Sequence, residues 1–116
     1  MPPTPDPRSF LPLTPAVFHI LLSLADEDRH GYAIAEEVEA MTRGEVKLGP
    51  STLYGTIDRM AEAALIVETD QRDRDERRRY FHLTTLGRSV ARAEALRLEQ
   101  LLGIARAKAI LSRGRS

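Results

Sequence analysis

The sequence contains no cysteine and no tryptophan. Without cysteine the chain can form neither disulfides nor thiolate metal sites, and nothing in it signals the redox state of its compartment. No run approaches the roughly 20 apolar residues of a transmembrane helix, and the first residues lack the apolar segment of a signal peptide. These absences predict a soluble, cytoplasmic protein that does not enter a membrane.

The motifs of the common enzyme classes are also missing. There is no glycine-rich phosphate loop and no nucleophile elbow around a serine. The three histidines, His19, His30 and His82, are scattered and have no paired carboxylates at metal-ligand spacing. The sequence therefore predicts no enzyme, no metal site and no cofactor.

The charge of the chain is balanced in total but uneven along its length. Its 116 residues, enough for one domain, hold 17 basic and 17 acidic residues. Residues 1–58 hold 4 basic and 9 acidic residues, net −5, whereas residues 59–116 hold 13 and 8, net +5. The totals exclude a globally basic nucleic-acid binder, but the second half favours an anionic partner.

A central helix is predicted from Gly49 to Ala64. Pro50 suits the first helical turn, where its missing N–H has no partner, and Gly49 or Ser51 can serve as N-cap. At roughly 100° per residue, apolar residues fall on one stripe and polar or small residues fall opposite. The expected core stripe holds Leu53, Ile57, Met60, Ala61 and Ala64, and the opposite face holds Ser51, Gly55, Asp58, Arg59 and Glu62.

Gly55 lies in the middle of the predicted outer face. Glycine there costs about 1 kcal/mol of helix stability relative to alanine and gains nothing from burial. A face that approaches the DNA major groove closely would use a residue without Cβ, flanked by short hydroxyls and an arginine. The alternative is a tolerated glycine on an ordinary surface helix.

The segments before this helix predict two further helices. Six of the seven prolines lie in the first 15 residues, so residues 1–12 are expected to form an extended, disordered arm. Thr14 and Pro15 are typical of the start of a helix, predicted over residues 15–25. A second helix is predicted from His30 to a stop at Gly44, with a weak signal for a strand at residues 46–48. Together with the central helix this arrangement indicates a helix-turn-helix.

A wing and a long last helix are predicted after the helix-turn-helix. Residues 65–69 and 78–83 have the β-branched and aromatic content of antiparallel strands, joined by a polar hairpin tip. Thr84 can cap a helix that begins at Thr85 and runs for about 27 residues, or about 40 Å at ~1.5 Å per residue. Because its apolar residues extend beyond what a small body can cover, the sequence predicts a second chain on that face.

The predicted fold class is mostly α with a small β-hairpin (α+β), a winged helix-turn-helix with a long C-terminal dimerisation helix. The predicted segments are the arm at 1–12, the DNA-binding domain at 13–83 and the dimerisation helix at 84–116. Predicted DNA contacts are Ser51, Thr52, Tyr54, Gly55, Thr56, Arg59, Arg72, Arg74, Arg77, Arg78 and Arg79. Predicted dimer contacts are Val90, Ala93, Leu96, Leu101, Ile104 and Leu111.

From about Leu13 onward the chain resembles the PadR-family transcriptional regulators. The matching motifs are His30-Gly31-Tyr32, Ser51-Thr52-Leu53-Tyr54, Leu65-Ile66 and Arg78-Arg79-Tyr80-Phe81-His82-Leu83-Thr84-Thr85-Leu86-Gly87. Two features depart from the typical pattern: Ser51 stands where many relatives have glycine, and the C-terminal region is a single helix, as in the short subgroup.

The resemblance implies a homodimeric repressor whose last helix forms much of the dimer interface, bound to double-stranded DNA at an inverted repeat. Some short members also bind planar drugs between aromatic residues at that interface. This chain has no tryptophan and no aromatic residue after His82, which argues against such a pocket and leaves the identity of any small-molecule effector open.

Two less specific interpretations stand beside these predictions. The arginine-rich hairpin can be a solvated, self-paired loop, and Tyr54 can be a core residue that also reaches a phosphate. The whole module can also be a winged helix that binds an acidic protein instead of DNA. Sequence-preferring binding to duplex DNA that weakens steeply with salt would separate the two functions.

Overall fold

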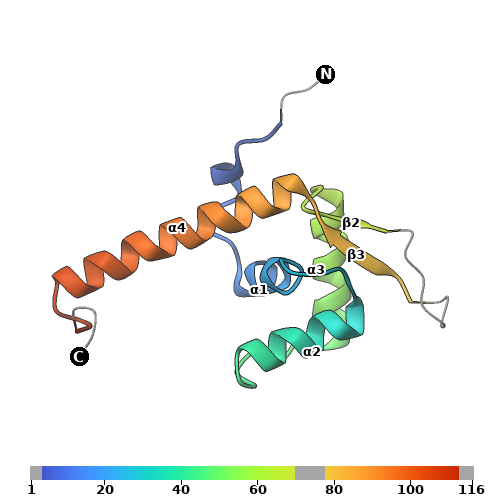
Figure 1. Ribbon diagram of the computed structural model, residues 1–116, viewed down its shortest axis with the longest axis horizontal. Coiled ribbons are helices and arrows are strands. Elements are labelled where there is room, and N and C mark those ends of the chain that lie inside the picture. Colours follow the sequence, from blue (N-terminus) through green and yellow to red (C-terminus); the bar gives the residue numbers. More distant parts are fainter. Residues whose placement is uncertain (1–3, 70–77, 113–116) are drawn as a thin grey trace.

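The computed structural model describes residues 4–69 and 78–112. The chain begins with a short 3₁₀ helix, η1 (Pro7–Phe10), and continues through α1 (Pro15–Ser23), β1 (Arg29–His30) and α2 (Gly31–Met41). It then forms α3 (Pro50–Glu62), β2 (Ile66–Glu68), β3 (Tyr80–Leu83) and α4 (Thr85–Ala107). Figure 1 shows α1, α2 and α3 gathered beside the small sheet, while α4 extends away from them as a rod. The fold is the predicted winged helix.

The core lies where α1, α2, α3 and the sheet meet. Its side chains come from every one of these elements and from the first half of α4, so a single apolar cluster joins the whole body. The buried members are Ile20, Leu21, Leu24, Ile34, Val38, Leu53, Ile57, Met60, Leu65, Ile66, Phe81, Leu83 and Val90.

Side-chain caps fix where three of the four α-helices begin. The hydroxyl of Thr14 accepts a hydrogen bond from the N–H of Val17 at 3.3 Å, and the hydroxyl of Thr84 accepts one from the N–H of Gly87 at 2.9 Å. Nδ1 of His30 accepts from the N–H of Ala33 at 3.1 Å. These bonds satisfy N–H groups that the first turn leaves without helical partners. The caps predicted at Thr14 and Thr84 are confirmed.

The sheet has three strands, one more than predicted. Strand β3 lies in the middle, antiparallel to both neighbours, in the order β1-β3-β2. Arg29 and His30 pair with Phe81 and Tyr80, and Ile66 pairs with Leu83 on the other side. A two-residue strand gives no periodic signal, which is why β1 was not predicted.

Two other predictions for the body differ from the structure. The segment before α1 is not an extended arm over its full length, because residues 7–10 form η1, which packs against α4. Asp6 caps η1 by accepting from the N–H of Arg8 at 2.9 Å, and Pro7 suits its first turn. Residues 46–48 form no strand; Val46 and Leu48 instead pack against the core from an irregular connector.

A buried carboxylate ties the segment before α1 to α4. Glu94 is 3% exposed, and its Oε2 accepts a hydrogen bond from the N–H of Leu13 at 3.2 Å. Arg97 donates to both oxygens, at 2.6 Å from Nε and 3.0 Å from Nη2. These bonds from Arg97, helped by the bond from Leu13, hold the pKa of Glu94 below its ordinary value against the opposing effect of burial. The arrangement neutralises a charge that burial alone would disfavour.

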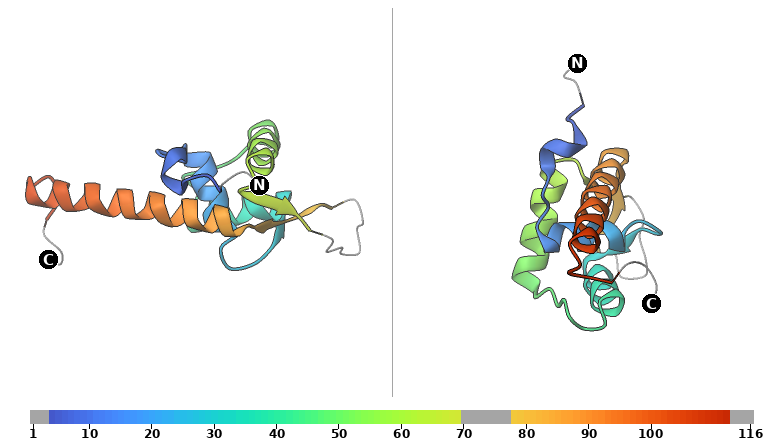
Figure 2. Two further views of the ribbon diagram at one scale, coloured as in Figure 1. Left: turned by 90° about the horizontal axis from the view of Figure 1, so that it is seen from above. Right: turned by 90° about the vertical axis from the view of Figure 1, so that its left-hand side faces the viewer.

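The far part of α4 leaves the body. The helix has 23 residues instead of the predicted 27 or so, because the chain turns at Lys108 and Ala109 has a φ of 62°. Seen from above in Figure 2, its C-terminal end has none of the other helices or strands beside it. Its large apolar side chains are exposed from Leu96 onward.

Candidate nucleic-acid interface

Helix α3 presents a polar outer face. Ser51, Thr52, Asp58 and Arg59 are exposed, and Gly55 is partly exposed among them. On the inner side Leu53, Ile57 and Met60 are buried as predicted, whereas Ala61 and Ala64 are exposed because the helix ends at Glu62 and the chain turns toward β2. An exposed polar face on a helix is the kind of surface that can read base edges in a major groove.

Thr56 does not belong to that outer face. Its side chain is 2% exposed, because three residues after Leu53 and one before Ile57 it returns to the core side of the helix. Its hydroxyl accepts a hydrogen bond from Nη2 of Arg59 at 3.3 Å. The prediction that Thr56 lies nearest the bases is wrong; it positions the side chain of Arg59 instead.

Tyr54 is held by the start of α2. A Cβ placed on Gly31 would lie 2.5–2.7 Å from the Tyr54 hydroxyl and ring atoms, so only glycine allows the ring to lie there. The side chain of Tyr54 is nevertheless 45% exposed. The ring therefore packs against Gly31 at the surface and not in the core, and the contact of the Tyr54 hydroxyl with a phosphate stays a prediction.

Gly55 has no such constraint within the chain. A Cβ there would meet only Nη1 of Arg59, at an ordinary contact distance of 3.7 Å. The protomer itself therefore gives no reason for glycine at this position, and the helix tolerates the roughly 1 kcal/mol that glycine costs relative to alanine.

The wing contributes two arginines within the described residues. Nε of Arg79 donates to Oε1 of Glu68 at 3.1 Å, and its guanidinium lies 5.3 Å from the centre of the Phe81 ring. Arg78 lies beside His30, with 3.1 Å between its Nη1 and Nε2 of the imidazole. The other predicted wing contacts, Arg72, Arg74 and Arg77, lie outside the described residues.

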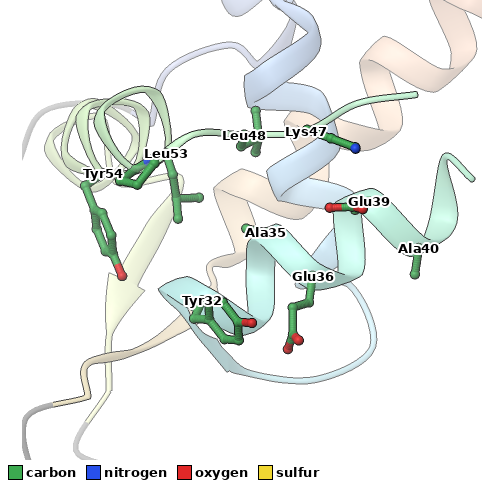
Figure 3. A pocket seen from close by; sticks show the side chains of 10 residues that line it. Tyr32, Ala35, Glu36, Glu39, Ala40, Lys47, Leu48, Leu53 and Tyr54 are labelled. Atoms are coloured by element: carbon green, nitrogen blue, oxygen red, sulfur yellow. The ribbon is translucent and has the colours of Figure 1, made fainter. Parts of the chain in front are cut away.

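Two concave surfaces flank Tyr54, and they differ in charge. The larger, of about 570 Å³, is the groove between α2 and α3, where Glu36 and Glu39 stand along α2 and Lys47 lies on the connector. Figure 3 shows Tyr32 and Tyr54 at one end of this groove. The smaller, of about 250 Å³, is a polar hollow lined by His30, Gly31, Tyr32, Tyr54, Arg78 and Arg79. The groove therefore carries carboxylates and the hollow carries guanidinium groups.

The predicted dimer contacts divide into two groups. Val90 is fully buried in the core of its own protomer, so the prediction that it contacts a second chain is wrong. Ala93 is partly buried and lines a hollow between α4 and the segment before α1. The other predicted contacts are exposed apolar residues: Leu96, Leu101, Ile104 and Leu111.

Sequence reasoning overlooked His30 and Tyr32 as candidate site residues. The His-Gly-Tyr motif was assigned to the start of a helix, and its side chains were given no role. The signal that could have found them is Gly31, since a glycine at a helix start can mark a close approach, here by the ring of Tyr54 from α3.

No helix within residues 4–69 and 78–112 combines the length and hydropathy needed to cross a membrane. No group of three or more histidine, aspartate and glutamate side chains there has the arrangement of a metal site.

Comparison with known families identifies the chain. A model described as the transcriptional regulator PadR-like family matches residues 20–93, from α1 into α4. The chain belongs to the PadR-like family. It is 34% identical over 84 residues to the transcriptional regulator Rv3488 of Mycobacterium tuberculosis, a match that covers 72% of this chain and 75% of that PadR relative. A match of the same identity and length is an uncharacterized 37.1 kDa protein in transposon TN4556 of Streptomyces fradiae, of whose length the chain spans only 23%.

Solved structures agree with the PadR-like fold. A PadR family transcription regulator from Clostridium difficile R20291 has a TM-score of 0.68 at 22% identity, over 81% of this chain and 97% of that one. A transcriptional regulator from Clostridium thermocellum has the same TM-score at 20% identity, over 86% and 90% of the two chains. The complex structure named hsRosR-S4 has a TM-score of 0.66 at 26% identity, over 90% and 97%. The predicted winged-helix fold and the predicted family are confirmed.

Proposed function

We propose that this PadR-like protein is a homodimeric, sequence-specific DNA-binding repressor that recognises an inverted repeat. The observation that carries the proposal is the outer face of α3, where Ser51, Thr52 and Arg59 are exposed around Gly55. These short polar side chains and one arginine can approach base edges, and Arg78 and Arg79, just before β3, can meet phosphates. The enzyme classes considered above have no comparable support in the described residues.

The dimer is proposed from the far part of α4. Leu101 and Ile104 are 49% and 55% exposed, and Leu96 is 47% exposed. Exposed leucines and isoleucines repeated along one helix form an apolar surface of the kind that a second copy covers in a two-fold dimer. Such a dimer would present two copies of α3, so the preferred DNA site should be an inverted repeat with half-sites about 34–36 Å apart or a multiple of that.

The deciding experiment is selection of bound duplexes from a random pool, with the salt dependence of binding to the selected site measured afterwards. An enriched inverted repeat, bound as a dimer with affinity that falls steeply with salt, would support the proposal. Absence of any enriched sequence, together with salt-insensitive binding, would instead favour the protein-interaction function. Placing the selected site between a promoter and a reporter gene would then distinguish a repressor from an activator.

Gly55 gives a test on the protein side. Gly55→Ala has room for its Cβ and should raise the free energy of unfolding by up to about 1 kcal/mol. Gly55→Leu should keep the fold but abolish preference for the selected site, because its side chain would stand between α3 and the bases. The matched control is Glu62→Leu, which adds the same side chain at the exposed end of α3. Normal affinity and sequence preference in the Gly55→Leu dimer would contradict the recognition-helix assignment.

The wing is proposed to supply affinity that does not depend on sequence. Replacing Arg77 and Arg79 by alanine should weaken binding to all duplexes alike, because guanidinium–phosphate contacts release counterions whatever the bases are. The slope of log affinity against log salt should fall by about one for each lost contact. An unchanged slope would show that these arginines are solvated or paired with residues such as Glu68.

A further inference from the structure

A polar hollow lies at the junction of α2, α3 and the start of β3, and its lining is rich in hydrogen-bond donors. Its polar lining consists of His30, the hydroxyls of Tyr32 and Tyr54, and the guanidinium groups of Arg78 and Arg79. Among the described residues no carboxylate lines it, although Arg79 also binds Glu68 on the outside of the sheet. A hollow of about 250 Å³ lined by donors suits a small oxyanion or one phosphate group of a larger molecule.

The tautomer of His30 follows from its role as the cap of α2. Its Nδ1 accepts a hydrogen bond from the N–H of Ala33, so that nitrogen carries a lone pair. In a neutral imidazole the proton must then lie on the other nitrogen, Nε2, which becomes a donor. Yet Nε2 lies 3.1 Å from Nη1 of Arg78, and a guanidinium can only donate. Two donors therefore face one another across the edge of the hollow.

Two neighbouring donors become compatible when both donate to a single acceptor that lies beside them. A phosphate oxygen accepts several hydrogen bonds at once, and its charge strengthens each of them. The ring of His30 is held for this contact, since it stacks with Tyr32 at a centroid distance of 6.5 Å and meets Tyr80 edge-on at 5.3 Å. The donor on Nε2 therefore has a fixed direction before any ligand arrives.

We propose that His30 Nε2–H and Arg78 together bind one backbone phosphate of duplex DNA, beside the hydroxyls of Tyr32 and Tyr54. The inference rests on the DNA binding proposed above and adds two residues, His30 and Tyr32, to the contact surface. The hollow is continuous with the outer face of α3 through Tyr54 and with the wing through Arg78. The phosphate would thus be bound where the helix-turn-helix and the wing meet, whereas Glu36 and Glu39 make the neighbouring groove unsuitable for DNA.

The variant that isolates this contact is His30→Asn. Asparagine is a good N-cap, so its side-chain oxygen can still accept from the N–H of Ala33 and preserve the start of α2. It has no group equivalent to Nε2–H. The midpoint of thermal unfolding should therefore stay close to that of the wild type, while affinity for every duplex falls about tenfold. The salt slope should be unchanged, because a neutral donor displaces no counterion.

Arg78→Gln should behave differently from His30→Asn. It removes a charge, so both the affinity and the salt slope should fall, the slope by about one. If both donors share one phosphate, the two losses should not multiply, and His30→Asn should cost less than about threefold in the Arg78→Gln background. The control is His82→Asn on β3, whose ring binds Oδ1 of Asp28 at 2.7 Å and which should leave DNA affinity unchanged.

Several outcomes would overturn the inference. Wild-type DNA affinity in His30→Asn would do so, as would fully independent losses in the double variant. If His30→Asn unfolds, His30→Ser provides a second capping residue without the ring donor, and wild-type affinity in that variant would also count against the site. Inorganic phosphate that shifts the His30 ring signals in NMR spectra, with no effect of the variants on DNA affinity, would assign the hollow to a free anion. Failure of the wild type to bind any duplex would instead refute the proposed function itself.

Discussion

The two halves of α4 have the same secondary structure and opposite surroundings. In the first half Val90 is fully buried and Glu94 is 3% exposed, packed by α1, the sheet and the segment before α1. In the second half Leu101 and Ile104 are about half exposed, and no other helix or strand of the described protomer covers them. An apolar stripe on a helix therefore predicts that the stripe is buried, but it does not tell whether the same chain or a second chain covers it.

The largest expected effect tests the exposed half. Leu101→Glu with Ile104→Glu places four new charges in the proposed dimer interface and removes apolar contacts worth about 1.5 kcal/mol or more each when fully buried. The dissociation constant of the dimer should rise at least about a thousandfold, measured by analytical ultracentrifugation. Gln100→Glu is the control for charge alone. A full-length wild type that is a folded monomer at micromolar concentration would contradict the proposed dimer, because the exposed half of α4 would then need no partner.

The next effect tests the packed half. Gly87→Ala places a Cβ against the backbone carbonyl of Leu65, which cannot rotate away. The free energy of unfolding should fall by about 3 kcal/mol, because α4 and the segment between α3 and β2 must separate to admit the methyl group. Chemical denaturation would measure the change, best in the Leu101→Glu, Ile104→Glu background so that dimer dissociation does not contribute. An unchanged free energy of unfolding in Gly87→Ala would show that the first half of α4 is loosely packed.

A smaller effect depends on pH and concerns the carboxylate within the packed half. Because the pKa of Glu94 is lowered in the folded protein, its stabilising effect is present above the unfolded-state value of about 4.3. That contribution is lost as the pH falls through the lower folded-state pKa. Glu94→Gln should therefore lower the free energy of unfolding by about 1–2 kcal/mol at neutral pH. The difference from the wild type should shrink as the pH falls below the unfolded-state pKa and through the lower folded-state pKa. A pH-independent difference would show that Arg97 does not stabilise the charge.

The smallest effect is that of the second glycine in α4. A Cβ on Gly103 would meet nothing within 4 Å in the protomer, in contrast to Gly87. Gly103→Ala should thus raise helix stability by up to about 1 kcal/mol. If two α4 helices cross closely at this position, the same change should weaken the dimer instead. The free energy of unfolding, measured in the monomeric background, reports the effect on the helix, and the dimer dissociation constant reports the effect on the interface. If Gly103→Ala increases both helix stability and dimer affinity, the two α4 helices do not cross closely at this position.

The parts of the fold that the sequence predicted are those with a strong local pattern. The capping threonines, the proline at the start of α3 and the alternating residues of β3 each act within a few positions, so helices and wing were placed correctly to within a few residues. The PadR motifs added the family. The position of η1 was not predictable from local pattern, because η1 packs against α4, which lies far away along the chain.

The errors at the candidate site have a common physical cause. Polarity predicted exposure for Thr56, but a threonine is small enough to be buried when a neighbour such as Arg59 binds its hydroxyl. Hydrophobicity predicted a partner for Val90, and its partner is the core of its own chain. In both cases the residue type was consistent with two environments, and only the tertiary packing of α3 and α4 selects between them.

Strand β3 joins the two ends of the helix-turn-helix to each other. It pairs with β1, which directly precedes α2, and with β2, which follows α3, so the intervening chain forms a loop closed by the sheet. A closed loop of this kind resists internal rearrangement, because moving α2 away from α3 would break strand pairing as well as core contacts. Any signal that regulates DNA binding in such a protein would act more easily on the separation and relative angle of two rigid recognition units than on the shape of either one. The half-site spacing that the protein prefers would then respond most to the signal, because α4 would set the separation of the two units.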